Sequence, residues 1–474
     1  MRIVGTSILF LFLNLSLFSQ SNQVYHQDSL ISWTRDLTDE VSAKHPGFYR
    51  YTTEERFDFL IDSTISTIDK PLNTLEYYRK IKPLFAQIGC LHTGLSLNPD
   101  LQKEIDSRTN LLPLEVFINY DSKVLVVDNY DDENQIPRGS EILSINGTSI
   151  DKVVSILLKS IPSDGYNTTL KTKLLNYRFA FWYRSQIEEN SHFMVEFKKQ
   201  DVINSITLTA VKSHNFPSQK ELERDYEKPL AFEIKDGIGR LTIHTFSKSV
   251  IKSYNQNFKK FISNVFEQLE EQCIENLILD LRGNTGGSDP HAALLTSYFF
   301  DEEFSYWDRV EVTKATAEEI KGSVRLFYKK PIKQDSIYLW QKIWIAKDFD
   351  YYEKQQPAKN NFKGQTILLT DGFCMSSCAD VTAILDYNEK AIIVGQETGG
   401  GYQGNTSGLM PSTELPMGLI VTMPLHKYVN AVDENKYHGH GTMPDEPVMY
   451  TYEELLSEQD LEMKRAMELI VNSN

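Results

Sequence analysis

A short apolar strand that breaks into a glycine-rich turn constrains the fold of this chain more than any other feature. Residues Leu277–Leu281 are apolar except for Asp280 and lead directly into the turn Arg282–Gly287. Such a run predicts a buried strand, and the glycines after it predict a turn with exposed backbone N–H groups. A second strand, Thr366–Thr370, is followed by a tight turn and by small residues that open a helix. A serine at that strand-to-helix turn would lie where helix-end N–H groups can stabilise an oxyanion.

Strands and helices alternate around these two segments. The order strand, amphipathic helix, strand before the glycine turn predicts a parallel pair joined by a right-handed crossover. Alternation of this kind is typical of an α/β domain with a mixed sheet, which we place at residues 228–474. Its expected elements are strands at Ile238–Ile243, Leu277–Leu281, Ile343–Ala346, Thr366–Thr370 and Ile392–Gly395, and helices at Tyr254–Gln272 and Ala379–Leu385.

The N-terminal region begins with a segment unlike the rest. Residues 1–20 carry Arg2 and then a short apolar run, which is typical of a secretory signal peptide and too short for a membrane span. From residue 21 to 108 apolar residues recur at helical spacing, so we expect an N-terminal helical cap. Near its end His92 lies on a glycine-bounded turn that enters an alternating strand. A lone histidine is usually structural, but this placement on a turn favours a functional role.

Residues 109–213 form a β-rich segment. Between Ile136 and Gly147 a glycine turn leads into a strand and then into an Asn146-Gly147 pair, which suits positive φ angles. A helix is expected next, at Val153–Leu158. This order resembles the central segment of a PDZ domain, a fold that binds extended peptide ends by adding a strand to its sheet. The alternative is a PDZ-shaped spacer without a ligand, because the usual carboxylate-binding loop is not recognisable.

The net charge of the chain limits the classes of binding partner. The formal net charge of −16 would repel nucleic acid and anionic membranes. No second long apolar stretch follows the signal peptide, so we expect no stable membrane insertion and an exported protein, periplasmic or extracellular after cleavage. The expected partner is a peptide or unfolded-protein substrate, and the oligomeric state is left open.

Four cysteines are too few for a disulfide scaffold. Cys374 and Cys378 lie at helix spacing, where a bridge would constrain little. A metal site built from these two with Cys90 and His92 is a weak alternative, because a Cys-x3-Cys motif lacks the paired Cys-x2-Cys pattern. We therefore expect buried free thiols, and neither a metal nor a cofactor.

Five motifs occur in the order found in one peptidase family. The chain resembles the C-terminal-processing (tail-specific) and tricorn-core serine peptidases, over most of its mature length. The resemblance implies an α/β multidomain fold: a helical cap, a PDZ-like β-rich domain and a crotonase-like α/β peptidase core. The motifs are Gly89–Thr93, the PDZ-like segment, Asp280–Gly287, Ser376–Ser377 with Val394–Gly400, and Gly439–Asp445.

The resemblance also assigns the reacting groups. Ser376 is the nucleophile when the register is fixed, without a gap, from Gly395 downstream. Ser377 is its rival, because it stands three residues before Asp380, and the family often has an acid at that distance. His92 matches the histidine of the tricorn branch, where it would act as general base and then as general acid.

Two departures concern the rest of the relay. The lysine of the processing branch is absent, since Gly401 occupies its position. The tricorn branch has a serine before its histidine, where this chain has Leu91, and it has a glutamate near the chain's tail motif. Glu434 is our candidate for that glutamate, although the nearest matching position holds His438, and Asp433 is also close.

The glycine turn carries the remaining site residues. The resemblance implies an oxyanion hole made by the N–H of Ser377 and that of Gly286 or Gly287. Arg282 could clamp a substrate carboxylate, but a salt bridge to a nearby acid such as Asp280 is the commoner role for a turn arginine.

These assignments predict a secreted serine endopeptidase that cleaves peptides or unfolded protein ends through a Ser–His mechanism. A catalytically weak or inactive peptide-binding scaffold with the same fold is the second hypothesis, because a histidine without an orienting carboxylate has no fixed tautomer. A crotonase-like acyl-transfer enzyme is the third, and the histidine motif and PDZ-like segment speak against it.

Overall fold

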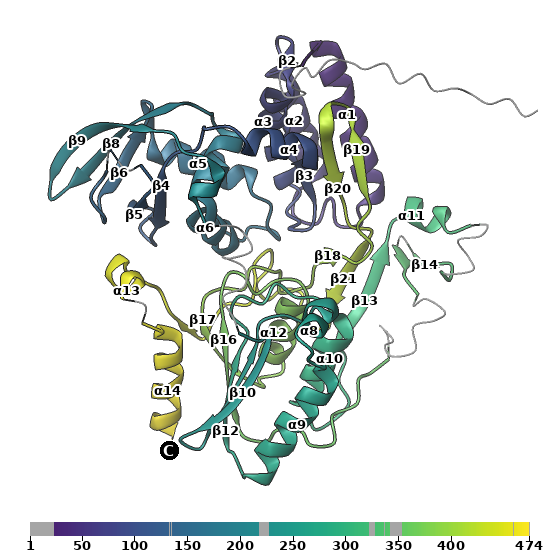
Figure 1. Cartoon of the computed structure of the whole chain (residues 1–474). Helices are drawn as coiled ribbons and strands as arrows, with labels where there is room; N and C mark the ends of the chain where they lie inside the picture. Colours follow the sequence, from purple (N-terminus) through teal and green to yellow (C-terminus); the bar gives the residue numbers. More distant parts are fainter. Residues whose placement is uncertain are drawn as a thin grey trace, which may run out of the picture.

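The computed structural model describes residues 23–131, 133, 135–217, 227–321, 328–335, 337–341, 353–457 and 459–473. The predicted signal peptide and the strand expected at Ile343–Ala346 lie outside these residues. In the described part of the chain, no helix combines the length and apolar character that crossing a membrane requires. The described residues form a mixed α/β fold of several modules (Figure 1).

A six-stranded sheet forms the centre of the C-terminal core. Its order is β10-β11-β12-β16-β17-β22; the first pair is antiparallel and the others are parallel. The predicted parallel pairing of the strand at 238–243 with the strand before the glycine turn is thus confirmed. The strands are β10 (Leu230–Lys235), β11 (Ile238–Ile243), β12 (Asn276–Asp280), β16 (Gln365–Thr370), β17 (Ile392–Gly395) and β22 (Glu446–Pro447).

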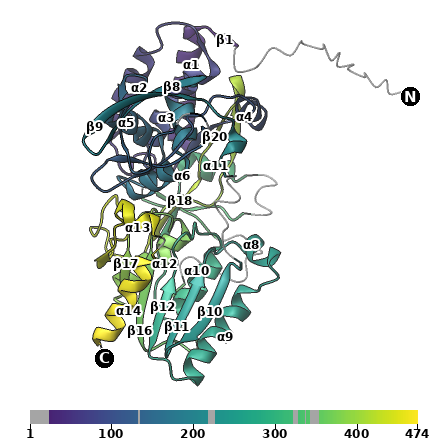
Figure 2. The same cartoon turned by 60° about the vertical axis from the view of Figure 1, so that its left-hand side comes forward.

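Helices cover both faces of this sheet because its central strands are apolar on both sides. Leu277 and Leu279 of β12 pack with the helices α9, α10 and α12, whereas Ile278 packs with α14 (Figure 2). The helix predicted over 254–272 is α9 and begins later, at Phe258, because Asn255 adopts a left-handed φ of 56° and Asn257 caps the helix. The core helices are α8 (Lys248–Ser253), α9 (Phe258–Glu271), α10 (Asp289–Ser297), α12 (Ser377–Tyr387), α13 (Tyr452–Leu456) and α14 (Leu461–Ser473).

The N-terminal helices share one hydrophobic cluster with a distant part of the chain. Strand β20 pairs with β3, so that Leu419 lies opposite Leu97, and Met417 and Val421 enter the same cluster. Residues 412–422, which we had assigned to the core, therefore complete the N-terminal layer (Figure 1). Its elements are β1 (Val24–Tyr25), α1 (Gln27–Lys44), α2 (Glu54–Ser66), β2 (Leu72–Asn73), α3 (Thr74–Ala86), β3 (Gly94–Leu97), α4 (Pro99–Asp106), β19 (Ser412–Leu415), the 3-10 helix η4 (Pro416–Gly418) and β20 (Leu419–Thr422).

The β-rich middle module has its own sheet and core. The sheet runs β4-β5-β6-β8-β9, and β7 pairs with β6 through a turn at Asn146 and Gly147, whose φ angles of 49° and 75° confirm the predicted Asn-Gly turn. The helix expected at 153–158 is the centre of α5. The elements are β4 (Leu114–Ile118), β5 (Val124–Asn129), β6 (Glu141–Ile145), β7 (Thr148–Ser149), α5 (Ile150–Ser160), α6 (Thr169–Gln186), β8 (His192–Lys199), β9 (Val202–Thr209) and the 3-10 helix η2 (Ser213–Asn215).

A third sheet, of order β14-β15-β13-β21-β18, flanks the core. It joins the segment after α10 to the segment after β17, and so brings Thr406 toward the N-terminal layer, where Cys90 Sγ lies 3.6 Å from the Thr406 carbonyl oxygen. Its elements are β13 (Trp307–Val312), β14 (Ile332–Gln334), β15 (Ile337–Leu339), β18 (Thr406–Ser407), β21 (His426–Asn430) and the adjoining α11 (Lys314–Glu319).

Candidate active site

Ser376 lies at the turn between β16 and α12. It is the residue before the first turn of α12, with φ 52° and ψ −132°. A non-glycine residue at such angles is strained by about 1–3 kcal/mol and persists only where its surroundings hold it. The backbone supplies that support: Asp380 N–H donates to the Ser376 carbonyl at 3.1 Å, and Met375 N–H donates to the Asn284 carbonyl at 3.2 Å. The side chain of Ser376 is half-buried, and no hydrogen bond involves it among the described residues.

The glycine turn packs directly against this serine. A Cβ placed on Gly286 would lie 2.8 Å from Ser376 Cβ and 2.8 Å from the Met375 carbonyl oxygen. Gly286 N–H already donates to Asn284 Oδ1 at 2.9 Å. Among the described residues, the N–H groups of Gly287 and Ser377 make no hydrogen bond. Of the predicted oxyanion donors, these two are therefore the unoccupied ones.

Two polar side chains that the sequence did not single out fix the glycine turn. Asn284 is fully buried and donates through Nδ2 to the Ile243 carbonyl at 2.9 Å, in addition to accepting Gly286 N–H. Asp371 Oδ1 accepts Gly283 N–H at 3.0 Å, and its Oδ2 pairs with Lys173 Nζ of α6 at 2.5 Å. Burial alone would raise the pKa of Asp371, but the Lys173 charge and the N–H donors outweigh it and lower the pKa. The turn is thus held partly by the middle module.

His92 lies on the turn before β3, next to residues from two other modules. Its side chain is partly exposed, but Nδ1 is buried and has no hydrogen-bond partner in the described part of the chain. Burial lowers the pKa of His92, while the charge of Asp164 and the Thr406 carbonyl act in the opposite direction. The imidazole is therefore mainly neutral near pH 7, as a general base must be.

Asp164 connects the His92 segment to the Ser376 segment. It lies in the loop between α5 and α6 and is 3 % exposed. Its Oδ1 accepts Leu91 N–H at 3.0 Å, and its Oδ2 accepts Gly401 N–H at 3.1 Å. The neighbouring Gly400 packs on Ser376, since a Cβ placed on Gly400 would lie 3.0 Å from Ser376 N. The signal that could have found Asp164 is an acid in an Asp-Gly turn of the segment after the PDZ-like helix.

The structure brings Ser376, Gly286, Gly287 and Ser377 together, and His92 joins them through Asp164. Within the described residues, no hydrogen bond links His92 to Ser376. Glu434 lies elsewhere: its side chain is exposed, and its carbonyl accepts Gln403 Nε2–H at 3.2 Å. Glu434 as the third relay member stays a prediction.

The expectation of free thiols was wrong for one pair of cysteines. Cys374 and Cys378 form a disulfide, with their Cα atoms 5.4 Å apart, whereas Cys90 and Cys273 are free. Cys374 precedes α12 and Cys378 lies in its first turn, so the turn at Ser376, and not helical spacing, brings the two sulfur atoms into reach. The bridge closes around Ser376 and Ser377, so it ties both ends of the strained turn to each other.

Arg282 belongs to a salt-bridge network. Its guanidinium contacts Asp280 at 2.6 Å, Asp460 at 2.7 Å and Glu462 at 3.2 Å, and its side chain is 21 % exposed. The pairing with Asp280 confirms the salt bridge that we favoured over a substrate clamp.

We expect Arg282→Met to lower the free energy of unfolding by about 3 kcal/mol, because removing the shared cation leaves three acids uncompensated. Urea unfolding at pH 7 measures this. Asp460→Asn is the matched control and should cost less than about 1 kcal/mol, since its side chain is 46 % exposed. Arg282→Met could instead leave the free energy of unfolding unchanged and raise KM for peptides with a free C-terminal carboxylate. That result would show that Arg282 binds the substrate carboxylate.

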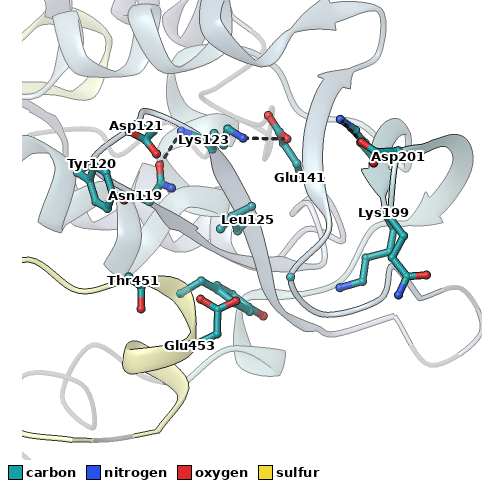
Figure 3. A pocket seen from close by; sticks show the side chains of 14 residues that line it. Asn119, Tyr120, Asp121, Lys123, Leu125, Glu141, Lys199, Asp201, Thr451 and Glu453 are labelled. Carbon is teal, nitrogen blue, oxygen red and sulfur yellow. Dashed lines mark hydrogen bonds and ion pairs between the residues drawn. The ribbon is translucent and has the colours of Figure 1, made fainter.

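A cleft of about 510 Å³ lies apart from these residues, between the middle module and α13. Figure 3 shows Lys123 directed toward Glu141, with which it forms an ion pair at 3.7 Å, while Thr451 and Glu453 of the α13 segment close the opposite side. None of the predicted site residues lines it.

Comparison with known proteins places the fold. The model of peptidase family S41 matches residues 237–448. The crystal structure of mature CPAF aligns with a TM-score of 0.60 at 13 % identity, over 90 % of this chain and 94 % of its own. Mature CPAF complexed with lactacystin aligns with a TM-score of 0.61 at 13 % identity, over 94 % and 97 %. A putative peptidase from Parabacteroides merdae covers 94 % and 96 % at 15 % identity, with a TM-score of 0.47.

At these identities the CPAF structures show a shared fold, and the family match covers every segment of the core that contacts Ser376. A peptidase acts on peptide or protein substrates. Through residues 237–448, the chain belongs to peptidase family S41, the C-terminal-processing peptidases, and it is a serine-type peptidase.

Proposed function

We propose that this protein is a secreted endopeptidase that hydrolyses peptides or unfolded protein ends, with Ser376 as nucleophile and His92 as general base. One observation carries this: the strained Ser376 stands at the N-terminus of α12, against the glycine turn, beside two N–H groups that have no partner among the described residues. A nucleophile and an oxyanion hole need this arrangement, because the developing negative charge must meet prepositioned donors.

The reaction follows from these positions. His92 takes the proton of Ser376 Oγ, which attacks the scissile carbonyl carbon, and the carbonyl π electrons move to the oxygen. The N–H groups of Gly287 and Ser377 hold that oxyanion; Gly286 N–H is already engaged with Asn284. The imidazolium then gives its proton to the amine nitrogen as the C–N bond breaks, and water repeats the sequence on the acyl-enzyme.

The modules around the site suit a polypeptide substrate. We propose that the middle module is PDZ-like and that the core is crotonase-like. The six-stranded antiparallel sheet with its Asn-Gly turn and α5 supports the first assignment, and the alternation of strands and helices in the core supports the second. We further propose that residues 1–20 direct export, which would place the peptidase in the periplasm or outside the cell.

Labelling with a fluorophosphonate probe tests the function directly. We expect wild-type protein at pH 7.5 to become labelled, and peptide mapping to place the adduct on Ser376, because only an activated serine reacts with this probe at a useful rate. An adduct on Ser377 would move the nucleophile by one residue.

A peptide-binding scaffold is the second candidate, favoured by the absence of a hydrogen bond between His92 and Ser376 in the described residues. Unlabelled wild-type protein that still binds extended peptides in fluorescence anisotropy would establish it. The enzyme is favoured because catalytic hydrogen bonds in unliganded sites often tighten only once substrate binds.

A further inference from the structure

We propose that Asp164 is the positioning carboxylate of this peptidase, which holds the His92 imidazole in the orientation that accepts the Ser376 proton. This inference rests on the proposed Ser–His mechanism and names the third member that sequence comparison had sought at Glu434. The residue comes from the loop between α5 and α6 of the middle module, outside the segment that matches the peptidase family.

The geometry of Asp164 is that of an anchored carboxylate. Its two oxygens accept N–H groups from Leu91, which precedes His92, and from Gly401, which follows the glycine packed on Ser376. Each oxygen accepts a single backbone N–H and so keeps a lone pair for a further donor. The loop itself is fixed on both sides, since Gly165 N–H donates to the Gly89 carbonyl at 2.9 Å and Tyr166 N–H donates to the Gly439 carbonyl at 2.7 Å.

His92 can supply the further donor to Asp164 through its Nδ1–H group. Nδ1 of His92 is buried without a partner among the described residues, which is costly for a polar nitrogen and is relieved when Nδ1–H turns to a carboxylate. Asp164 is the acid whose charge acts on His92. With Nδ1–H directed to Asp164, the lone pair lies on Nε2, free to take the Ser376 proton, and the carboxylate stabilises the imidazolium that forms.

Several other titratable or charged groups act on His92 or Asp164, but the carboxylate that acts on His92 is that of Asp164. His45 also acts on His92, but burial lowers the pKa of His45 to about 4, so it is neutral. Burial raises the pKa of Asp164, while the charges of His92 and Arg50 and the N–H groups of Leu91 and Gly401 act in the opposite direction. Arg50 also donates to the Gly404 and Gln403 carbonyls at 3.1 and 3.0 Å. The charge of Asp164 also acts on Cys90, Tyr51 and Asp380, and burial raises the pKa of each.

The matched control for Asp164→Asn is Asp131→Asn. Asp131 is a second buried acid of the middle module, and it likewise accepts two backbone N–H groups, from Glu133 at 3.0 Å and Thr209 at 2.7 Å. Both variants lose the same kind of anchoring, but only one loses a charge beside His92.

We expect Asp164→Asn to lower kcat/KM by about 10³–10⁴-fold and to move the acid limb of the kcat/KM profile to lower pH. The Asp164 carboxylate favours the imidazolium form of His92, so its removal lowers the pKa of His92. His92 then stays neutral, and active as a base, at lower pH. Asp131→Asn should lower the melting temperature without moving the limb. An unmoved limb in Asp164→Asn, or a shift produced by Glu434→Gln instead, would overturn the proposal.

A second measurement does not depend on turnover. In wild-type protein with ¹⁵N-labelled histidine, we expect the His92 signal, assigned by its loss in His92→Gln, to report the Nδ1–H tautomer at pH 8; an Nε2–H tautomer would contradict the role of Asp164. This separates two failures: no labelling of Ser376 removes the proposed reaction, while an Nε2–H tautomer in a labelled enzyme removes only Asp164.

Discussion

Replacing Ser376 by alanine is expected to lower kcat on an unfolded protein substrate by about 10⁴-fold or more, because without the nucleophile only oxyanion and binding effects remain. Stability should hardly change, since the Ser376 side chain makes no hydrogen bond in the described structure and alanine keeps the Cβ that packs on Gly286. Release of fluorescent peptides from labelled casein, calibrated by active-site titration of wild type, measures the effect.

Ser377→Ala is the comparison that decides the register. Ser377 is 1 % exposed, and its Oγ is buried without a partner in the described residues, which is a poor position for attack on a substrate. Alanine retains the backbone N–H at this position, so we expect a loss below about tenfold. A loss in Ser377→Ala equal to that in Ser376→Ala would remove the distinction, and a larger one would make Ser377 the nucleophile.

The proposed active site draws its residues from three modules, and this decides what could be predicted from sequence. The strand and glycine turn at 277–287, the Asn146-Gly147 turn and the Ser376 helix follow from apolar runs and glycine positions within a few residues, so local patterns predicted them. The role of Asp164 depends on its contacts with Leu91 and Gly401, which are far apart in the chain. Contacts between such distant residues leave no periodic pattern in the sequence.

The same limit explains the other differences. The pairing of β20 with β3 depends on a sheet formed by two segments that are far apart in the chain, and the segment 412–422 carries an ordinary strand pattern that suits either module. The Cys374–Cys378 bridge depends on the turn that precedes α12, and burial of both residues had suggested free thiols instead. Local patterns were enough to propose the reacting residues, whereas their neighbours became visible only in the fold.

Through Lys173, the middle module also contacts the residues that hold the glycine turn of the proposed active site. It pairs with Asp371, which in turn holds Gly283 N–H of the glycine turn. Thr169 Oγ1 of the same helix donates to Glu397 Oε2 at 2.8 Å, and Asn167 Nδ2 donates to the Thr398 carbonyl at 2.8 Å. The seam between module and core is therefore polar and specific along the start of α6, and displacement of α6 would release the glycine turn and Asp164 together.

Gly286→Ala is expected to lower kcat by about 10²–10³-fold, the cost of misplacing one oxyanion donor. Gly286 has a φ of 92°, and a Cβ there would meet Ser376 Cβ and the Met375 carbonyl oxygen at 2.8 Å, both of which belong to the nucleophile's own turn. Either the glycine turn or Ser376 must move by several tenths of an ångström, and the oxyanion hole loses its spacing. KM should change less, because the oxyanion forms only in the transition state.

Gly283→Ala separates this clash from backbone strain. Gly283 lies in the same turn with a φ of 72°, but a Cβ there would meet no atom within 4 Å. Both variants bear the cost of a positive φ, about 1–2 kcal/mol, which thermal unfolding measures. We expect only Gly286→Ala to lose kcat. If the two variants lost kcat equally, turn flexibility would govern the rate; if neither did, the oxyanion would have to be bound away from Gly286 and Gly287, and the site proposed at this turn would fail.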